Sequence, residues 1–178
     1  MPLLYSEHRV LVNGHQQGIL CVEISPTGKF VATGGQDGVV CIWAMSSGTV
    51  VHRLKGQSRS SVLCLQWSPG RDDRLYFGLA DGVVAMGVVD QRLKVDGQLM
   101  HQTPIEHLSI SPDSKILAVG AQSVLRLTAL SLDGQFGESQ VLASPPTNSA
   151  SSSEEVLITS VKWMKSQLVV TYMYHGLA

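Results

Sequence analysis

Residues 14–43 read GHQQGILCVEISPTGKFVATGGQDGVVCIW, and this stretch decides the fold of the chain. Two apolar runs are separated by the turn sequence SPTG at 25–28, and a third run follows QDG at 36–38. Short runs bounded by Gly, Pro, Asp and Ser are typical of strands, and Asp-Gly between two runs is a strong hairpin signal. The stretch therefore predicts three antiparallel strands in succession.

The same plan recurs downstream at a constant spacing. Ser-Pro pairs begin at residues 25, 68 and 111, so both intervals are 43 residues. The apolar runs before these pairs align position by position: Ile19, Val62 and Ile105; Val22, Leu65 and Leu108; Ile24, Trp67 and Ile110. A shorter fourth strand is predicted in each unit, at Thr49–Leu54, near Arg92–Val95 and at Ser139–Leu142. No sustained helical stripe is present, and four strands repeating every 40 to 45 residues predict β-propeller blades.

At these residues the chain resembles the WD-repeat β-propeller family. The first unit has Gly14-His15 where the family has its Gly-His pair, and Trp43 where the family has its Trp, although Ala44 replaces the Asp that usually follows. The resemblance implies a hydrogen-bonded structural tetrad of His15, Thr33, Asp37 and Trp43. A buried Asp needs hydrogen-bond donors, and a His, a hydroxyl and an indole N–H can supply them.

The later units match the first by spacing and apolar pattern more than by the tetrad. The second unit keeps only Asp81, and the third keeps only His101, with Thr128 in place of the Trp. Residues 144–153, SPPTNSASSS, interrupt the rhythm and are predicted to form a flexible surface loop. After it the pattern restarts, with Trp163 aligned to Trp67 and Thr171 aligned to Thr33.

The count of strands predicts an incomplete ring. We predict one all-β propeller domain over residues 1–178, with four-stranded antiparallel blades at about 14–56, 57–100 and 101–143, and half a blade at 154–178. An extra strand at Arg9–Val12 stands where the family has the outer strand of the preceding blade. About three and a half blades leave apolar faces open at both ends. The chain is therefore expected to be a truncated piece of a longer propeller, or to close by association with another copy; a small closed ring of four blades is the alternative.

Composition restricts the class of partner. The chain of 178 residues has 13 basic and 14 acidic residues and a net charge of -1, which gives no field that favours nucleic acid or an anionic membrane. Its three cysteines show no CxxC spacing, as expected for reduced thiols in the cytoplasm or nucleus. We accordingly expect protein partners, no nucleic acid, no membrane, and self-association through the open blade faces.

No pattern in the sequence predicts chemistry. The six histidines lack the spacing of metal sites, and Glu106 and His107 are neighbours on a predicted strand, so their side chains should point to opposite faces. The segment GQSRS at 56–60 lacks the final Gly of a nucleophile elbow. We therefore expect no enzyme activity, no metal and no cofactor.

Surface recognition remains as the expected function. The favoured hypothesis is a non-catalytic protein–protein interaction scaffold, and the alternative is an accessory propeller of a larger multidomain enzyme or signalling protein. The resemblance implies that partners bind the loops between blades and the turns between second and third strands. In this chain the residues predicted to bind partners there are Gln16, Gln17, Gln36, Arg59, Ser60, Gln102, Thr103 and Gln122.

Overall fold

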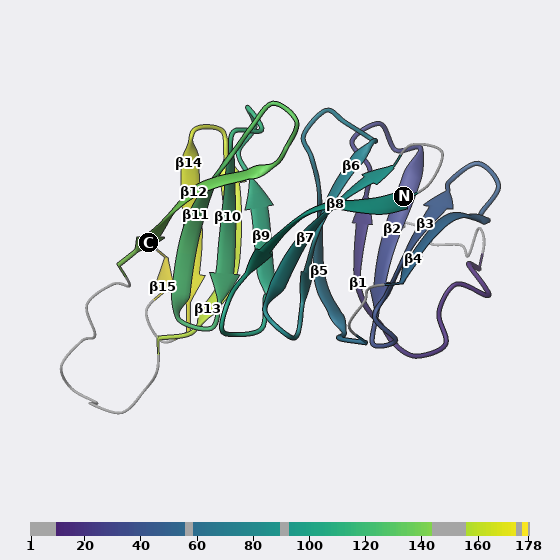
Figure 1. Ribbon diagram of the computed structural model, residues 1–178, viewed down its shortest axis with the longest axis horizontal. Helices are drawn as coiled ribbons and strands as arrows, with labels where there is room; N and C mark the ends of the chain where they lie inside the picture. Colours follow the sequence, from purple (N-terminus) through teal and green to yellow (C-terminus); the bar gives the residue numbers. More distant parts are fainter. Residues whose placement is uncertain (1–9, 56–58, 90–92, 144–155, 174–175, 178) are drawn as a thin grey trace, which may run out of the picture.

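The computed structural model describes residues 10–55, 59–89, 93–143, 156–173 and 176–177. This part of the chain contains β-strands and no helix, and the strands form four antiparallel sheets (Figure 1). The all-β prediction is therefore confirmed. The loop predicted at residues 144–153 lies outside the described residues.

Each sheet is built from consecutive strands. The first contains β1 (Ile19–Ile24), β2 (Phe30–Gly35), β3 (Val39–Ala44) and β4 (Val50–Lys55). The second contains β5 (Val62–Trp67), β6 (Arg74–Leu79), β7 (Val83–Val89) and β8 (Leu93–Met100). The third contains β9 (His107–Ile110), β10 (Ile116–Ala121), β11 (Val124–Leu130) and β12 (Phe136–Leu142). The fourth contains β13 (Ile158–Met164), β14 (Gln167–Tyr172) and the short β15 (Gly176–Leu177).

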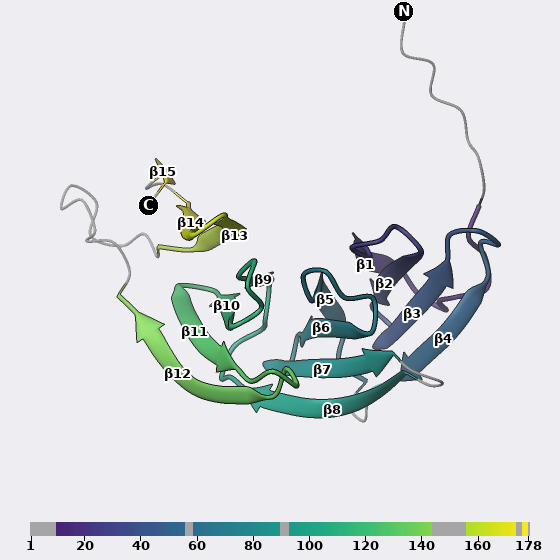
Figure 2. The same cartoon turned by 90° about the horizontal axis from the view of Figure 1, so that it is seen from above.

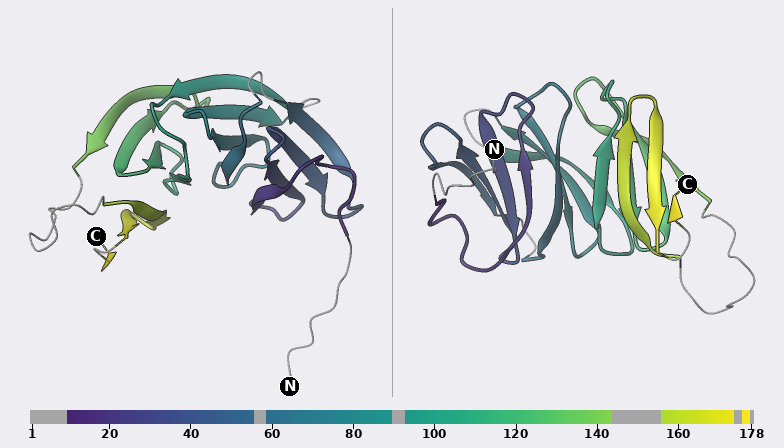
Figure 3. Two further views of the ribbon diagram at one scale, coloured as in Figure 1. Left: turned by 90° about the horizontal axis from the view of Figure 1, so that it is seen from below. Right: turned by 180° about the vertical axis from the view of Figure 1, so that it is seen from behind.

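The four sheets are arranged as the blades of an open propeller. They fan out along an arc, with β1, β5, β9 and β13 on its inner side and β4, β8 and β12 on its outer rim (Figure 2, Figure 3). A gap separates the fourth sheet from the first, so the sheets do not close into a ring (Figure 2). The prediction of blades in an incomplete ring is confirmed, and the alternative of a closed ring of four blades is wrong for this structure.

The extra strand predicted at Arg9–Val12 is not present in the described residues. Residues 10–12 form no strand, and Val10 and Val12 are exposed. A strand is stabilised by hydrogen bonds to a neighbouring strand, and residues 10–12 pair with none of the described strands.

The Asp-Gly turns explain how consecutive repeats are held together. Gly38 has a φ of 70°, a conformation that side chains disfavour, and a Cβ there would lie 2.9 Å from the carbonyl oxygen of Ser60. Gly82, in the equivalent turn, has a φ of 87°, and a Cβ there would lie 2.4 Å from the carbonyl oxygen of His101. Glycine is thus required at each turn for two reasons: the backbone has a positive φ, and the loop that leads into the next sheet lies too close for a side chain.

The aligned apolar residues are the ones that pack one sheet against the next. In the three later sheets the corresponding side chains all lie in the interface with the preceding sheet: Val62, Leu65 and Trp67; Ile105, Leu108 and Ile110; Ile158, Val161 and Trp163. In the first sheet the same positions are exposed, with Ile19 at 54%, Val22 at 62% and Ile24 at 60%. We call these three residues the open triplet.

A glycine in the second strand of each of the first three sheets leaves space for an apolar side chain of the next sheet, at the position that corresponds to Ile19. A Cβ on Gly34 would lie 2.5 Å from Val62 Cγ1, and a Cβ on Gly78 would lie 2.4 Å from Ile105 Cγ2. The third glycine of this kind, Gly120, is less tightly enclosed, with Ile158 Cγ2 at 3.3 Å from the same position. Each interface therefore contains a side chain that fits into a space left by a missing Cβ.

The residue paired with each glycine bonds to the backbone of the next sheet. Cys21 Sγ donates to Val62 O at 3.5 Å, and Cys64 Sγ donates to Ile105 O at 3.3 Å. The third member of this series, His107, has its Nε2 atom 3.2 Å from Ile158 O. In every sheet the residue of this series on the first strand pairs with one residue on the second strand. These pairs are Cys21 and Gly34, Cys64 and Gly78, His107 and Gly120, and, in the fourth sheet, Ser160 and Thr171. Thr171 thus takes the glycine position, and its predicted alignment with Thr33 is wrong by one residue.

Candidate interaction surface

The structure brings His15, Thr33, Asp37 and Trp43 together at the first sheet. His15 Nδ1 lies 3.1 Å from Asp37 Oδ1, and His15 Nε2 lies 2.8 Å from Thr33 Oγ1. Trp43 Nε1 donates to the same hydroxyl at 2.8 Å. The hydroxyl of Thr33 therefore bonds to both the indole of Trp43 and the imidazole of His15. Through its second nitrogen, His15 connects these strand residues to Asp37 in the turn between β2 and β3.

One assignment of hydrogens satisfies all of these contacts. Trp43 donates to Thr33, the hydroxyl of Thr33 donates to His15 Nε2, and His15 Nδ1–H donates to Asp37. The second carboxylate oxygen of Asp37 accepts from the backbone N–H of Gln16 at 2.9 Å. The polar side-chain atoms of the four residues are thus bonded to one another and to the backbone of the entering loop.

Asp37 is held in its ionised form. Burial opposes its ionisation, but hydrogen bonds from the backbone N–H of Gln16, from His15 and from the backbone N–H of Val39 outweigh burial and lower the pKa of Asp37. The folded pKa is thus below the unfolded pKa of about 3.9. Asp37 therefore stabilises the fold above the unfolded pKa, and this contribution disappears as pH falls through the folded pKa.

Substitution of Asp37 should consequently have a pH-dependent effect. We expect Asp37→Asn to lower the unfolding free energy at neutral pH and to have a progressively smaller effect below about pH 4. Urea unfolding at a series of pH values measures this difference. Asp133→Asn, which changes an exposed aspartate in the turn before β12, is the matched control. A wild-type advantage over Asp37→Asn that stays constant down to low pH would contradict the assignment.

The tetrad does not recur in the other sheets. His101 Nε2 is buried and has no hydrogen-bond partner among the described residues, and burial together with the charge of Arg126 lowers the pKa of His101. Thr128, at the position of Trp43, is fully buried and bonds to Ser139 Oγ at 2.9 Å. The later sheets are therefore held mainly by their apolar interfaces.

All eight residues predicted to bind partners lie along one edge of the arc. They come from the segments that lead into β1, β5 and β9 and from the turns β2–β3 and β10–β11, at the lower edge in Figure 1, where β9 begins. Six are exposed: Gln16, Gln17, Gln36, Arg59, Gln102 and Gln122. Ser60 and Thr103 are half-buried. We call residues 14–18, 36–38, 59–61, 80–82, 101–106 and 121–123 the loop edge.

Backbone hydrogen bonds hold the loop edge in place. The N–H of Gln36 donates to Gly18 O at 2.8 Å, and the hydroxyl of Ser61 donates to Gln36 O at 3.3 Å. One sheet further, the N–H of Asp81 donates to Ser60 Oγ at 2.9 Å, and the N–H of His101 donates to Gly82 O at 2.7 Å. These bonds join loops that are distant in sequence, so the exposed amides stand on a fixed backbone.

A cavity of about 400 Å³ continues the loop edge between the third and fourth sheets. Its lining is Glu106, His107, Gln122, Leu157, Ile158, Thr159 and Met173. Glu106 accepts from the backbone N–H of Gln122 at 3.4 Å, whereas His107 bonds to Ile158 O. The acid and the imidazole therefore do not meet, and the cavity offers an apolar wall with amide and carboxylate groups at its rim.

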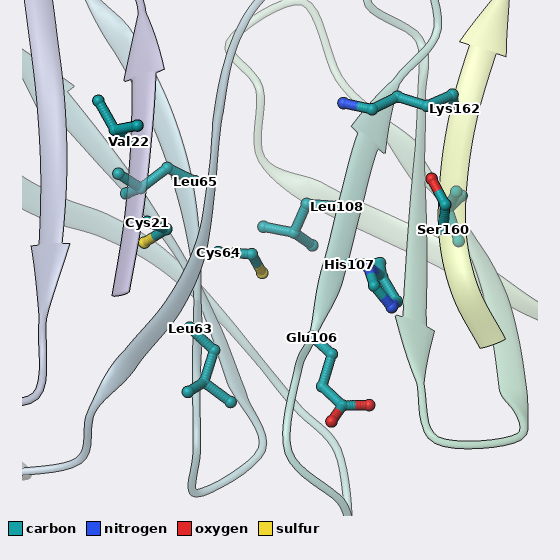
Figure 4. A pocket seen from close by; sticks show the side chains of 11 residues that line it. Cys21, Val22, Leu63, Cys64, Leu65, Glu106, His107, Leu108, Ser160 and Lys162 are labelled. Atoms are coloured by element: carbon teal, nitrogen blue, oxygen red, sulfur yellow. The ribbon is translucent and has the colours of Figure 1, made fainter. Parts of the chain in front are cut away.

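A smaller cavity of about 160 Å³ lies between the inner strands (Figure 4). Lys162 and Ser160 of β13 line it on one side, and Cys21 and Val22 of β1 line it on the other (Figure 4). On the same inner strands, Glu23 accepts from Gln66 Nε2 at 3.3 Å. Burial raises the pKa of Glu23, and the charge of Lys162 and the bond from Gln66 offset part of this rise.

The three cysteine thiols are not activated as nucleophiles. Burial raises the pKa of Cys21 to about 12 and also raises the pKa of Cys41 and Cys64, so these thiols are protonated and poor nucleophiles at neutral pH. No group of three or more His, Cys, Asp or Glu side chains is placed to hold a metal within the described ranges. The same ranges contain no helix long and apolar enough to cross a membrane.

Sequence reasoning located the loop edge but missed part of it. Ser61 and Glu106 hold its loops together, and Leu157 and Met173 line its cavity. Spacing could have pointed to Ser61 and Glu106, because each lies directly beside a residue already aligned between repeats. No sequence signal marks Leu157 or Met173, which come from the fourth unit.

Comparison with known proteins places the first unit in a family of repeats. Residues 6–44 match the WD domain, G-beta repeat family. Ribosome biogenesis protein erb1 of Pyrenophora tritici-repentis is 39% identical over 62 residues, which are 35% of this chain and 8% of that protein. Ribosomal RNA-processing protein 9 of Saccharomyces cerevisiae is 28% identical over 123 residues, which are 68% of this chain and 21% of that protein. The chain thus spans a small part of the length of these curated relatives.

A solved structure shares the fold. The crystal structure of the computationally designed Ika4 protein matches with a TM-score of 0.70 and 21% identity, over 97% of this chain and 97% of that chain. This likeness concerns the arrangement of sheets alone. The family resemblance drawn from the sequence is confirmed by the match at residues 6–44.

Proposed function

We propose that this WD-repeat chain acts as a non-catalytic scaffold that binds protein partners along its loop edge. The observation that carries this proposal is the row of exposed polar side chains on a hydrogen-bonded backbone, with Gln16, Gln36, Arg59 and Gln122 among them. Binding residues are typically found on loops that a rigid scaffold positions. Thr33, His15 and Asp37 do join a hydroxyl, an imidazole and a carboxylate, but the hydroxyl is buried and also accepts from Trp43, which favours recognition at the loop edge over catalysis.

The chemistry of the loop edge suits an extended or irregular protein segment. Amide side chains both donate and accept, so Gln36 and Gln122 can bond to a partner's backbone without requiring a charge. Beside Gln122, the cavity lined by Leu157 and Met173 can take an apolar side chain. Interfaces commonly combine one apolar anchor with a polar rim, and both are present within this short stretch of the edge.

The similar proteins suggest the kind of assembly. Two of them are described as acting in ribosome biogenesis and in ribosomal RNA processing, and we propose that the chain serves in a complex of that type. Protein contacts would supply the binding, since a net charge of -1 gives no overall field that favours RNA. We therefore propose that the chain works inside the cell, in the nucleus rather than the cytoplasm.

A second candidate follows from the lengths of the relatives. Because the matched segments are 8% and 21% of those proteins, an accessory propeller within a larger enzyme or signalling protein is the alternative function. Sequencing the transcript on both sides of this reading frame distinguishes the two. Further blades alone favour the scaffold, and an adjoining catalytic domain favours the alternative.

Variants of the loop edge test the scaffold proposal. We expect Arg59→Glu and Gln36→Arg each to reduce the recovery of specific partners about tenfold, because a central interface residue contributes on the order of 1.4 kcal/mol. The measurement is quantitative mass spectrometry of affinity-purified complexes from cells that express each variant. Lys29→Glu, a charge change on the opposite edge of the first sheet, should leave recovery unchanged. Equal recovery with all variants, or equal loss with Lys29→Glu, would overturn the proposed surface.

A further inference from the structure

One side of the first sheet repeats an interface that the molecule already uses three times. The positions of the open triplet pack against the preceding sheet in every later sheet, where all are buried except the half-buried Trp163. On β1 these side chains are exposed instead, and β1 belongs to the sheet that borders the gap in the arc (Figure 2). The strand register and the residue types of β1 match those of β5, β9 and β13. The side of the first sheet that carries the open triplet should therefore fit the side of another such sheet that normally packs against the next sheet in the chain, which we call the following face.

The fourth sheet presents such a following face. Ser160 stands at the position of Cys21, Cys64 and His107, each of which bonds to a backbone carbonyl of the next sheet. The acceptors Val62 O, Ile105 O and Ile158 O correspond to Ile19 O in the first sheet. A hydroxyl can make the same bond, so Ser160 is a donor for Ile19 O of whichever first sheet lies beside it.

Charge points to the same pairing. Glu23, Gln66, Ser109 and Lys162 are equivalent positions, and Glu23 bonds to Gln66 across the first interface. Across the third interface, Ser109 Oγ accepts from the backbone N–H of Trp163, next to Lys162. Continuing this series by one step sets Lys162 of one copy beside Glu23 of the other, two opposite charges that already act on each other within one chain.

We propose that two copies of the chain associate head to tail, each fourth sheet packing on the first sheet of the other copy. Two identical interfaces then form, and they bury both open triplets and pair Lys162 of each copy with Glu23 of the second copy. A head-to-tail contact produces a closed ring when its rotation brings the chain ends back together, and the open arc supplies that curvature (Figure 2). The inference does not depend on the proposed function.

One residue sets the strength of this contact. Thr171 occupies the position where the first three sheets have Gly34, Gly78 and Gly120, so the space that would receive Ile19 is partly filled. The interface between copies is therefore weaker than the interfaces within the chain. Thr171→Gly should tighten the dimer, whereas any substitution that merely damages the fold should not.

A charge exchange between two variants tests the pairing. The full chain should sediment as a monomer–dimer equilibrium in analytical ultracentrifugation. Glu23→Lys and Lys162→Glu should each weaken the dimer by about tenfold or more, because like charges then meet at both interfaces. An equimolar mixture of the two variants should recover dimers, since opposite charges meet again at both interfaces. Lys165→Glu, in the turn between β13 and β14, should behave like the wild type.

The remaining outcomes decide against the proposal. A wild-type chain that remains monomeric at every concentration, a chain that forms open-ended polymers, or a mixture that does not recover dimers would each overturn it. Circular dichroism shows whether the charge variants fold. If Glu23→Lys does not, Val22→Lys replaces it, because Val22 is 62% exposed and its substitution leaves the packed interfaces untouched. Unchanged dimerisation of Val22→Lys would also overturn the proposal.

Discussion

Trp43→Ala should lower the free energy of unfolding by about 3–5 kcal/mol, the usual range for removing a buried Trp. Trp43 is 2% exposed and packs directly beneath the loop that enters β1, where a Cβ on Gly14 would lie 2.2 Å from Trp43 Cζ2. Its indole also donates to Thr33 Oγ1 at 2.8 Å. The substitution therefore removes a core side chain and releases the start of the first sheet. Chemical denaturation followed by circular dichroism measures the change.

Trp43→Phe separates packing from hydrogen bonding. It keeps most of the apolar surface but removes the N–H, so the hydroxyl of Thr33 loses one donor. A net hydrogen bond contributes about 0.5–1.5 kcal/mol, and the Phe variant should lose about that much plus a small packing term. A loss below about 1 kcal/mol for Trp43→Ala would show that the indole does not hold the loop.

The residues that the repeat alignment groups together are the ones that form the sheet interfaces. Ile105 and Leu108 align with Val62 and Leu65 because each repeat places β-branched and aliphatic residues at the same distance from its Ser-Pro pair. Alternation places Leu65 and Trp67 on one face, because residues two apart on a strand share a face. Val62 lies three residues before Leu65 and reaches the same side through the register shift between Val62 and Cys64. The Asp-Gly turns were equally readable, because few residues other than Gly accept a positive φ.

The bonds between sheets could not be read in the same way. Cys21, Cys64 and His107 are 43 residues apart, but they differ in type, and only the backbone register shows that all three bond to equivalent carbonyls. The misplaced Thr171 has a related cause. Its strand, QLVVTY, has apolar residues on both faces, so alternation does not determine its register. The tetrad and the loop edge came from the family resemblance, which supplies roles that composition does not.

Gly78→Ala should lower the free energy of unfolding by about 1–3 kcal/mol, the range observed when a packed interface is overfilled. The new Cβ would meet Ile105 Cγ2 at 2.4 Å, Ile105 Cβ at 2.7 Å and Cys64 Sγ at 2.7 Å. Ile105 Cβ is fixed to the backbone, so the second and third sheets must move apart to accept a single methyl group. Gly137→Ala is the matched control, because a Cβ on this strand glycine would make only ordinary contacts, the nearest at 3.4 Å.

A double-mutant cycle shows whether Ile105 is the obstacle. Ile105→Ala alone should cost about 2–5 kcal/mol, because it leaves a cavity in the interface between the second and third sheets. In the double variant the Ala at position 78 partly fills that cavity, so the two effects should combine to less than their sum by about 1 kcal/mol or more. Additive effects would mean that the methyl group at position 78 meets some other neighbour. The side chain of Ile105 and the bare backbone of Gly78 would then not be a matched pair, and the packing scheme that supports a closed dimer would lose its basis.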